Sequence, residues 1–258
     1  MAVRFPFLDH VGPLAFAHQG GALERPENSV AAFAHAIDLG YRYLETDVRL
    51  SADHRVVVIH DAVLDRVSDG SGAVAAYTWD ELSAVRLLAP DGTVSDEGLP
   101  LLEDVLTRWP EARVNIDAKD WRVAGPLAAL VQRLGVTDRV CLGAFDERRV
   151  RVLRHRVGRG LCTALGPVDV GRLVAAGRGL RTGRPWGACA QVPVRHGRVE
   201  VVTPAFVAAA HRYGVPVVVW TIDDEAEMHR LLDLGVDGLM TNRPTLLKAV
   251  LESRGQWA

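Results

Sequence analysis

Two carboxylates lie two residues apart in the apolar segment YLETDV, at Glu45 and Asp47. In a β-strand this spacing turns both side chains to one face. Such a pair is costly to bury unless a cation neutralises it. Asp117, in the segment NIDAK, is expected to add a third carboxylate from the neighbouring part of the fold. Three carboxylates without cysteine or histidine favour one divalent cation that prefers oxygen, Mg²⁺ or Ca²⁺, over zinc.

A lysine two residues after the third carboxylate shares its face of the strand. Lys119 is one of two lysines among 30 basic residues, the other being Lys248, and the remaining 28 are arginines. Because a compact ammonium and a planar guanidinium are not interchangeable, a lysine retained against this bias indicates a specific role. The alternative to a metal site is a salt-bridged polar layer in which Lys119 is the counter-ion of the carboxylates.

Two histidines each close an apolar segment: His18 ends LAFAH, and His60 lies in VVVIHD. Two histidines that face each other across a metal provide the general acid and the general base that cleavage of a phosphate ester requires. A single histidine at a strand end is more often a structural residue, but two beside an acidic cluster favour catalysis. Gly20 and Gly21 indicate a sharp turn that a ligand can approach closely. Asp61 is expected to orient a turn or His60.

The elements that must position these residues alternate between short apolar strands and amphipathic helices, several of which end at glycine. About eight strand–helix units in 258 residues predict a single α/β domain, the (β/α)8 TIM barrel. Between YLETDV and VVVIHD only SADHR intervenes, and residues 62–100 are expected to form a small insertion. Nine segments are candidates for the eight strands: LAFAH, YLETDV, VVVIHD, RVNIDAK, RVCLGAF, LCTAL, ACAQVP, VPVVVWT and DGLMTN.

In such a barrel the chemistry lies at the carboxyl ends of the strands. Gln191, Trp220 and Asn242 stand at expected strand ends. Trp220 is either an apolar wall for a ligand or an aromatic residue of the barrel core. Asn28 either caps the helix that starts near Ser29 or belongs to the site.

The composition argues against several classes of partner. A net charge of −2 leaves no basic excess for a nucleic-acid backbone. No apolar run reaches the roughly 18 residues of an integral membrane helix, and MAVRFPFLDH lacks the continuous apolar segment of a signal peptide. Six arginines between Gly171 and Arg198 predict a solvated loop, with attraction to an anionic head group or membrane surface as the alternative. The widely spaced Cys141, Cys162 and Cys189 predict reduced structural thiols in a cytoplasmic protein.

The chain resembles a known family over roughly residues 15–245. AHQGG-x4-PENS-x3-F, followed by LETDV-x-LSADHRVVVIHD-x2-LDRVSDGSG, is similar to the pattern of the glycerophosphodiester phosphodiesterases, H-R-G…P-E-N-T…E-x-D-V…D…V-x-x-H-D…L-x-R-T-T…G. The resemblance continues through NIDAK, VVVWTIDD and LGVDGLMTNRP. The first block is specific because several residue types recur at fixed spacing over some 55 positions.

The resemblance implies a barrel that hydrolyses glycerophosphodiesters, which are small-molecule substrates, to glycerol 3-phosphate and an alcohol. It implies that Lys119 holds the phosphate. The acid–base pair is then His18 and His60, and the metal ligands are Glu45, Asp47 and Asp117.

Two positions depart from the family pattern. Gln19 stands where the family usually has an arginine that contacts the phosphate, and a glutamine donates a hydrogen bond without bringing a charge. Either the metal and Lys119 suffice, or an arginine from elsewhere approaches the phosphate. Asp117 stands where the family typically has glutamate. It is one methylene shorter, so it reaches the ion directly only if its strand lies closer, and otherwise through water.

Two other functions stay open at this point. A phosphodiesterase on a similar barrel can act on lysophospholipid or phosphoinositide head groups, which a long apolar groove would indicate. A phosphate-ester binding protein that has lost catalysis is favoured by Gln19 and opposed by the retained histidine pair. The sequence does not separate attack by water from attack by a neighbouring glycerol hydroxyl through a cyclic phosphate. Nor does it assign the base, the head group or the oligomeric state.

Overall fold

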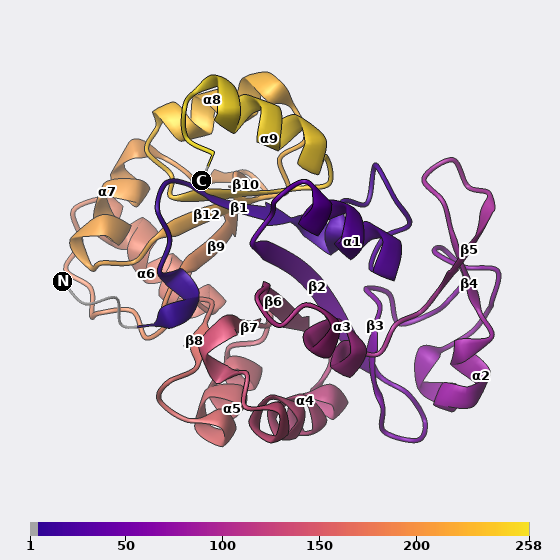
Figure 1. Cartoon of the computed structure of the whole chain (residues 1–258). Helices are drawn as coiled ribbons and strands as arrows, with labels where there is room; N and C mark the ends of the chain where they lie inside the picture. Colours follow the sequence, from indigo (N-terminus) through magenta and orange to yellow (C-terminus); the bar gives the residue numbers. More distant parts are fainter. Residues whose placement is uncertain (1–4, 258) are drawn as a thin grey trace.

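Eight parallel strands form a closed ring in this computed structural model, which describes residues 5–257 (Figure 1). The ends of the hydrogen-bonded path are joined by a parallel bridge between Ala164 and Cys189. Leu165 N donates to Cys189 O at 2.9 Å and Ala188 N donates to Thr163 O at 2.8 Å, so the ring closes there. The predicted TIM barrel is therefore confirmed. In order around the ring the strands are β1 (Leu14–Ala17), β2 (Tyr43–Leu50), β6 (Arg113–Ala118), β7 (Val140–Gly143), β8 (Cys162–Thr163), β9 (Ala190–Pro193), β12 (Val217–Trp220) and β13 (Gly238–Thr241).

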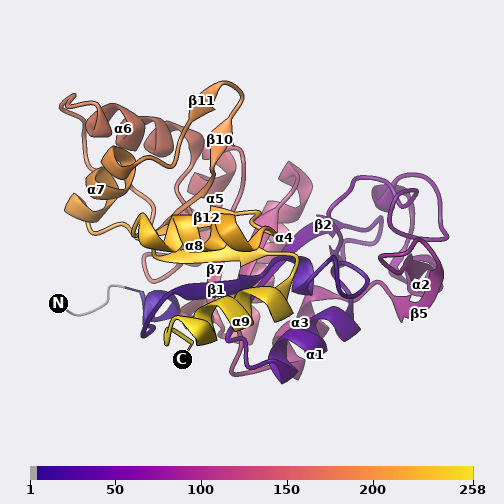
Figure 2. The same ribbon diagram turned by 90° about the horizontal axis from the view of Figure 1, so that it is seen from above.

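A helix follows each of these strands and packs on the outside of the ring (Figures 1 and 2). The glycine ends have the expected geometry: Gly135 follows the helix Trp121–Leu134 with φ 65°. Within residues 5–257 every helix is too short or too polar to serve as a membrane span. The helices are α1 (Val30–Asp38), α3 (Leu102–Arg108), α4 (Trp121–Leu134), α5 (Glu147–Val157), α6 (Pro167–Gly177), α7 (Pro204–Arg212), α8 (Glu225–Asp233) and α9 (Pro244–Ser253).

The solvated loop predicted between Gly171 and Arg198 is wrong at its start. Residues 171–177 belong to α6, because Leu173 is fully buried and Val170 and Val174 pack against the barrel core. Further on, the segment continues into β9 and then into a hairpin of β10 (Arg195–His196) and β11 (Val199–Glu200), which projects from the body in Figure 2.

The ninth candidate strand is not part of the ring. β3 (Val56–Val58) pairs antiparallel with β2, with Val58 opposite Val48. The five residues Ser51–Arg55 are enough for an antiparallel return, whereas a parallel crossover needs a dozen or more. VVVIHD is therefore the surplus candidate among the nine, and the other eight segments fill the eight positions.

The insertion expected around residues 62–100 is present. It contains α2 (Trp79–Ser83) and a hairpin of β4 (Arg86–Leu88) and β5 (Val94–Gly98), and it lies to one side of the barrel (Figures 1 and 2). Its apolar side chains, together with those of residues 57, 59 and 101 that flank it, form a core separate from that of the barrel. This core consists of Val57, Ile59, Leu64, Val67, Val74, Leu82, Leu87, Leu99 and Leu101.

The amino-terminal end of the barrel is closed by aromatic packing. Phe7, in the short turn Pro6–Leu8, packs on Phe16 and Tyr43, and the Tyr43 hydroxyl donates to the Phe7 carbonyl at 2.8 Å. Buried side chains such as Val218 and Met240 fill the ring with them. A ligand must therefore approach from the carboxyl ends of the strands, where the sequence predicts the site.

Candidate active site

The carboxylates meet where β2 and β6 run side by side. Asp47 is the register partner of Asp117, and Glu45 is the partner of Asn115. Glu45 and Asp47 are 4% and 1% exposed, so both carboxylates are withdrawn from water. The two-residue spacing on one strand and the neighbouring strand together produce the expected acidic group.

Lys119 lies between two of these carboxylates. Its Nζ is 2.8 Å from Asp47 Oδ1 and 2.8 Å from Asp117 Oδ2. Burial by itself raises the pKa of Asp47, but the Lys119 ammonium outweighs it and holds that pKa below its ordinary value. Burial likewise opposes the charge on Lys119, yet the two carboxylates raise its pKa above the ordinary value. The ion pairs of the counter-ion interpretation are therefore present, with one lysine charge facing three carboxylates.

Of the three carboxylates, Glu45 is the one that makes no ion pair with Lys119. Its Oε2 accepts a hydrogen bond from the backbone N–H of Gln19 at 3.1 Å and lies 3.7 Å from His18 Nε2. Burial, followed by repulsion from Asp47, raises the pKa of Glu45 well above its ordinary value. A buried carboxyl group in this state binds a proton or a cation readily.

The residues present fit a hard divalent cation. Asp117 Oδ1 is buried and has no hydrogen-bond partner, and all the donors are carboxylate oxygens. Glu45, Asp47 and Asp117 are not as close together as the ligands of a single ion, a closeness that within residues 5–257 is found in a cysteine trio. The ammonium of Lys119, placed between Asp47 and Asp117, accounts for part of that separation.

His18 is held in one orientation by an amide. Its Nδ1 lies 2.7 Å from Asn242 Oδ1. Asn242 donates through its backbone N and its Nδ2 to the two oxygens of Asp223, at 2.7 and 2.9 Å. Because the Asp223 carboxylate accepts from Nδ2, Oδ1 of Asn242 must face the histidine, and His18 must donate from Nδ1. The Nε2 atom of His18 is then the one directed at the carboxylates.

His60 reaches the site from β3. Ile59 N donates to Asp47 O at 3.0 Å, and this antiparallel pairing brings the next residue beside β2. His60 Nδ1 lies 2.6 Å from Asp61 Oδ1, so Asp61 orients the histidine as the sequence suggested. Arg66 Nε donates to the other oxygen of Asp61 at 2.6 Å. This hydrogen bond is the main cause that lowers the pKa of Asp61 to about 2.

Arg66 is itself anchored. Its two terminal nitrogens donate to both carboxylate oxygens of Glu27, at 2.7 and 2.9 Å. The segment PENS and the loop after β3 are thereby joined beside the second histidine. Bidentate arginine–carboxylate pairs fix orientation as well as adding energy, so this contact steadies the Asp61 carboxylate that holds His60.

Two amides support Asp47 from the loop after β1. Gln19 Nε2 donates to Asp47 Oδ2 at 2.7 Å, and Asn28 Nδ2 donates to the same oxygen at 3.4 Å. Asn28 does not cap the helix: Ser29 is the N-cap, and its Oγ accepts from Ala32 N at 3.0 Å. The capping interpretation of Asn28 is therefore wrong by one residue, and its side chain faces the site.

The glycine pair allows this loop to fold. Gly20 and Gly21 have φ values of 77° and 112°. A Cβ at Gly20 would lie 2.7 Å from the Ala32 Cβ, and one at Gly21 would lie 2.7 Å from Pro244 Cγ. Only glycine fits both the backbone conformation and the space.

Phe145 and Trp220 lie together beside Lys119. The two rings meet edge to face with centroids 5.7 Å apart, and Lys119 Nζ is 5.7 Å from the Phe145 centroid. Trp220 is half-buried and packs on the barrel interior, whereas Phe145 is 66% exposed. Phe145 is not among the predicted site residues, although it stands at the end of RVCLGAF, a candidate strand, where a barrel places its site residues.

An arginine from β2 also approaches the site. Arg49 follows Asp47 by two residues on the same strand face. Its Nε donates to the His60 carbonyl at 2.8 Å, and its Nη1 lies 3.6 Å from Asp120 Oδ2. It is the arginine that lies nearest in sequence to the carboxylates, but its described partners are His60 and Asp120.

Comparison with known proteins gives consistent matches over nearly the whole chain. A sequence model of the Glycerophosphoryl diester phosphodiesterase family matches residues 18–246. The "Probable glycerophosphodiester phosphodiesterase 2" of Mycobacterium tuberculosis is 38% identical, covering 97% of this chain and 95% of that protein. "Lysophospholipase D GDPD1" of Rattus norvegicus is 27% identical, covering 92% of this chain and 85% of that protein. The solved structure of an Oleispira antarctica phosphodiesterase in complex with the product sn-glycerol-3-phosphate has a TM-score of 0.77 at 18% identity, covering 93% of this chain and 97% of that one.

Proposed function

Because the chain belongs to the glycerophosphoryl diester phosphodiesterase family, we propose that it hydrolyses glycerophosphodiesters to glycerol 3-phosphate and an alcohol. The observation that carries this proposal is the pair of oriented histidines. His18 donates from Nδ1 to Asn242 and His60 donates from Nδ1 to Asp61, so each has Nε2 free to exchange a proton with a substrate. A protein that only binds a phosphate ester has no need of two such residues.

The family generally depends on a divalent cation, and we propose that here Glu45, Asp47 and Asp117 hold Mg²⁺ or Ca²⁺. The orphaned Asp117 Oδ1 and the raised pKa of Glu45 support this ligand set. When bound, the cation supplies positive charge to the oxygens of the phosphate. Lys119, whose ammonium is fixed by Asp47, would bind the phosphate beside it.

The histidines then divide the proton transfers. One Nε2 removes the proton of the attacking oxygen, and the other protonates the alcohol that leaves. The attacking group is a water molecule or the neighbouring glycerol hydroxyl, the second route passing through a cyclic phosphate. Gln19 donates to the Asp47 carboxylate and brings no charge, which leaves Lys119 as the protein cation paired with the carboxylates.

The aromatic pair supports a second candidate substrate class, the lysophospholipids. Phe145 is exposed beside Trp220 and Lys119, and can contact an acyl glycerol or an apolar head group next to the phosphate. A relative named for lysophospholipase D activity makes this class worth testing in the same assay. The cytoplasmic location expected from the reduced cysteines also stays a prediction.

The decisive experiment is release of glycerol 3-phosphate from glycerophosphocholine with Mg²⁺, with Ca²⁺ and with a chelator. We expect metal-dependent release that falls about 10²–10⁴-fold in His18→Ala and in His60→Ala. His155→Ala, on the exposed side of α5, is the matched control and should leave the rate unchanged.

Lysophosphatidylcholine as a second substrate separates the two substrate classes, with Phe145→Ala expected to reduce its turnover more than that of glycerophosphocholine. No release from either substrate with any metal, by protein shown to be folded, would refute the proposed reaction. Binding of glycerophosphocholine without turnover would identify the phosphate-ester binding alternative.

A further inference from the structure

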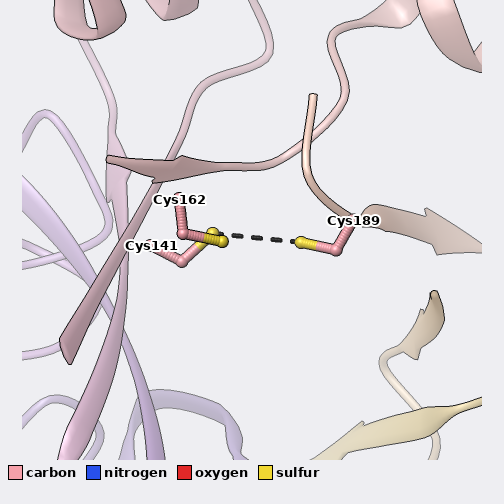
Figure 3. A group of neighbouring side chains, drawn as sticks. All are labelled: Cys141, Cys162 and Cys189. Atoms are coloured by element: carbon pink, nitrogen blue, oxygen red, sulfur yellow. Dashed lines mark hydrogen bonds between the residues drawn. The ribbon is translucent and has the colours of Figure 1, made fainter. Parts of the chain in front are cut away.

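All three cysteines of the chain meet inside the barrel, and their side chains point toward one another (Figure 3). Cys141 is on β7, Cys162 is on β8, and Cys189 immediately precedes β9, so three neighbouring strands of the ring contribute one sulfur each. Each is at most 1% exposed, and all are reduced. Residues that lie 21 and 27 positions apart in sequence therefore share one point in the barrel interior.

The sulfur atoms have the spacing of a site for a single ion. Cys141 Sγ and Cys189 Sγ are 3.9 Å apart, and all three Sγ atoms lie within 4.8 Å of one another. Three sulfurs bound at about 2.3 Å to one ion are about 4.0 Å apart in a trigonal plane. The widest pair needs to close by about 0.8 Å at most to reach that geometry.

A hydrogen-bond donor lies beside two of the sulfurs. Gln191 Nε2 lies 3.8 Å from Cys141 Sγ and 3.6 Å from Cys189 Sγ, and it also donates to Asn115 Oδ1 at 2.8 Å. An amide donor shared by two sulfurs stabilises negative charge on them. The sulfhydryl groups of Cys141 and Cys162 hydrogen-bond to Cys189 and hold its pKa well below the ordinary value, whereas burial raises the pKa values of Cys141 and Cys162 well above it. A bound cation must therefore displace the protons of Cys141 and Cys162.

We propose that Cys141, Cys162 and Cys189 form a binding site for one soft monovalent cation, Cu(I). Among residues 5–257 no histidine or carboxylate joins the group, so it offers three sulfurs and nothing else of that kind. Thiolate ligands select soft ions such as Cu(I), and Zn²⁺ in closed sites takes four ligands. Each cysteine that ligates the ion gives its proton to solvent, so the affinity falls as the pH is lowered.

This site is separate from the carboxylates and does not depend on the proposed hydrolysis. The carboxylates offer only oxygen and suit hard cations, whereas the cysteines offer only sulfur. Gln191 is the partly exposed residue that touches the sulfurs, and it bridges them to Asn115 next to Glu45.

The test is competition for Cu(I) between the full chain and a chromophoric Cu(I) chelator, in anaerobic buffer with excess Mg²⁺ present. We expect one equivalent of Cu(I) per chain and an ultraviolet sulfur-to-metal charge-transfer band. Affinity should fall by at least about 10²-fold in Cys189→Ser and in Cys162→Ala, since loss of even an outer-shell partner costs 10–100-fold. Cu(I) should also raise the Tm of the wild type and not that of these variants.

Met240→Leu is the matched control, because Met240 is buried in the same interior cluster and carries the other kind of sulfur. It should bind Cu(I) like the wild type. Equal affinity in the wild type and the triple serine variant would mean that the ion binds elsewhere, and would overturn the proposal. No binding by folded wild type would also overturn it and leave the cysteines as packing residues. The measurement on the wild type can therefore overturn the proposal even if a cysteine variant fails to fold.

Discussion

Replacing Lys119 by methionine tests whether one ammonium holds the buried acidic group together. Lys119 Nζ makes two ion pairs at 2.8 Å, and the partners Asp47 and Asp117 are both largely buried. Each pair is worth about 4 kcal/mol at an effective dielectric constant of about 20 and a charge separation of about 4 Å. Part of this is recovered because one carboxylate takes up a proton in the variant. We therefore expect Lys119→Met to lower the free energy of unfolding by about 3–5 kcal/mol near neutral pH.

The loss should depend on pH with a definite sign. The folded-state pKa of Asp47 is depressed, so its contribution to stability is present above its unfolded pKa and is lost as the pH falls. The pKa of Lys119 is raised, so its contribution is present below its unfolded pKa and is lost only in strong alkali. In the variant, burial of Asp47 is no longer offset by the ammonium, so its pKa rises and protonation relieves the buried charge. The difference from the wild type should therefore shrink between about pH 7.5 and about pH 4.

Urea unfolding followed by circular dichroism, in chelator and at several pH values, measures this difference. Lys248→Met is the matched control, since the other lysine of the chain makes one ion pair, at 3.8 Å to Glu252, at the surface. That change should cost less than about 1 kcal/mol. The double variant Lys119→Met with Asp117→Asn should recover part of the stability. A loss at Lys119 no larger than at Lys248, or one that does not change with pH, would refute the reasoning.

Three further predictions follow from the contacts around the site. Asn242→Ala removes the acceptor that fixes His18 Nδ1, so kcat should fall about 10–10²-fold with little change in KM. Steady-state kinetics measure both constants, and an unchanged kcat would contradict the positioning role of Asn242. Gln19→Arg brings a charge next to the expected phosphate position. Exchanging a neutral for a charge-assisted hydrogen bond gains about 1 kcal/mol, so kcat/KM should rise about fivefold. A lower kcat/KM would mean that the new guanidinium pairs with Asp47 instead of the phosphate. Arg66→Met removes the main cause that lowers the pKa of Asp61 to about 2. The Tm difference from the wild type should therefore be largest above about pH 4 and become smaller toward about pH 2. A Tm difference that stays constant with pH in thermal melts would exclude this linkage.

The barrel was predictable because its strands and helices repeat with simple periods. Eight of the nine apolar segments became ring strands, and the ninth, VVVIHD, has the same composition. Its antiparallel direction is encoded by the length of the link before it rather than by its own residues. The helix at Pro167–Gly177 was not predicted, because the glycines and arginines at its end are typical of a loop. The burial of Leu173, which stabilises the helix, depends on the neighbouring barrel.

The acidic group was predictable because it rests on a two-residue spacing and two adjacent strands. The partners of the histidines were harder to find. Asn242 is 224 positions from His18, and Asp223 touches it from the loop after β12, so only the closed ring joins them. The cysteine cluster did leave a signal, since each cysteine stands near the start of one of three successive candidate strands. Inward side chains that lie at the same level along the barrel axis in successive strands come close together.

β3 belongs to two structures at once. Val56 and Val58 pack into the barrel core, whereas Val57 and Ile59 pack into the separate core of the insertion. The His60 that follows is thus set against the barrel by one face of the strand, while the other face carries a module with its own interior. Any shift of this module relative to the ring would therefore move His60 with respect to His18, and the ion pair between Arg66 and Glu27 acts as a second clamp against such a shift.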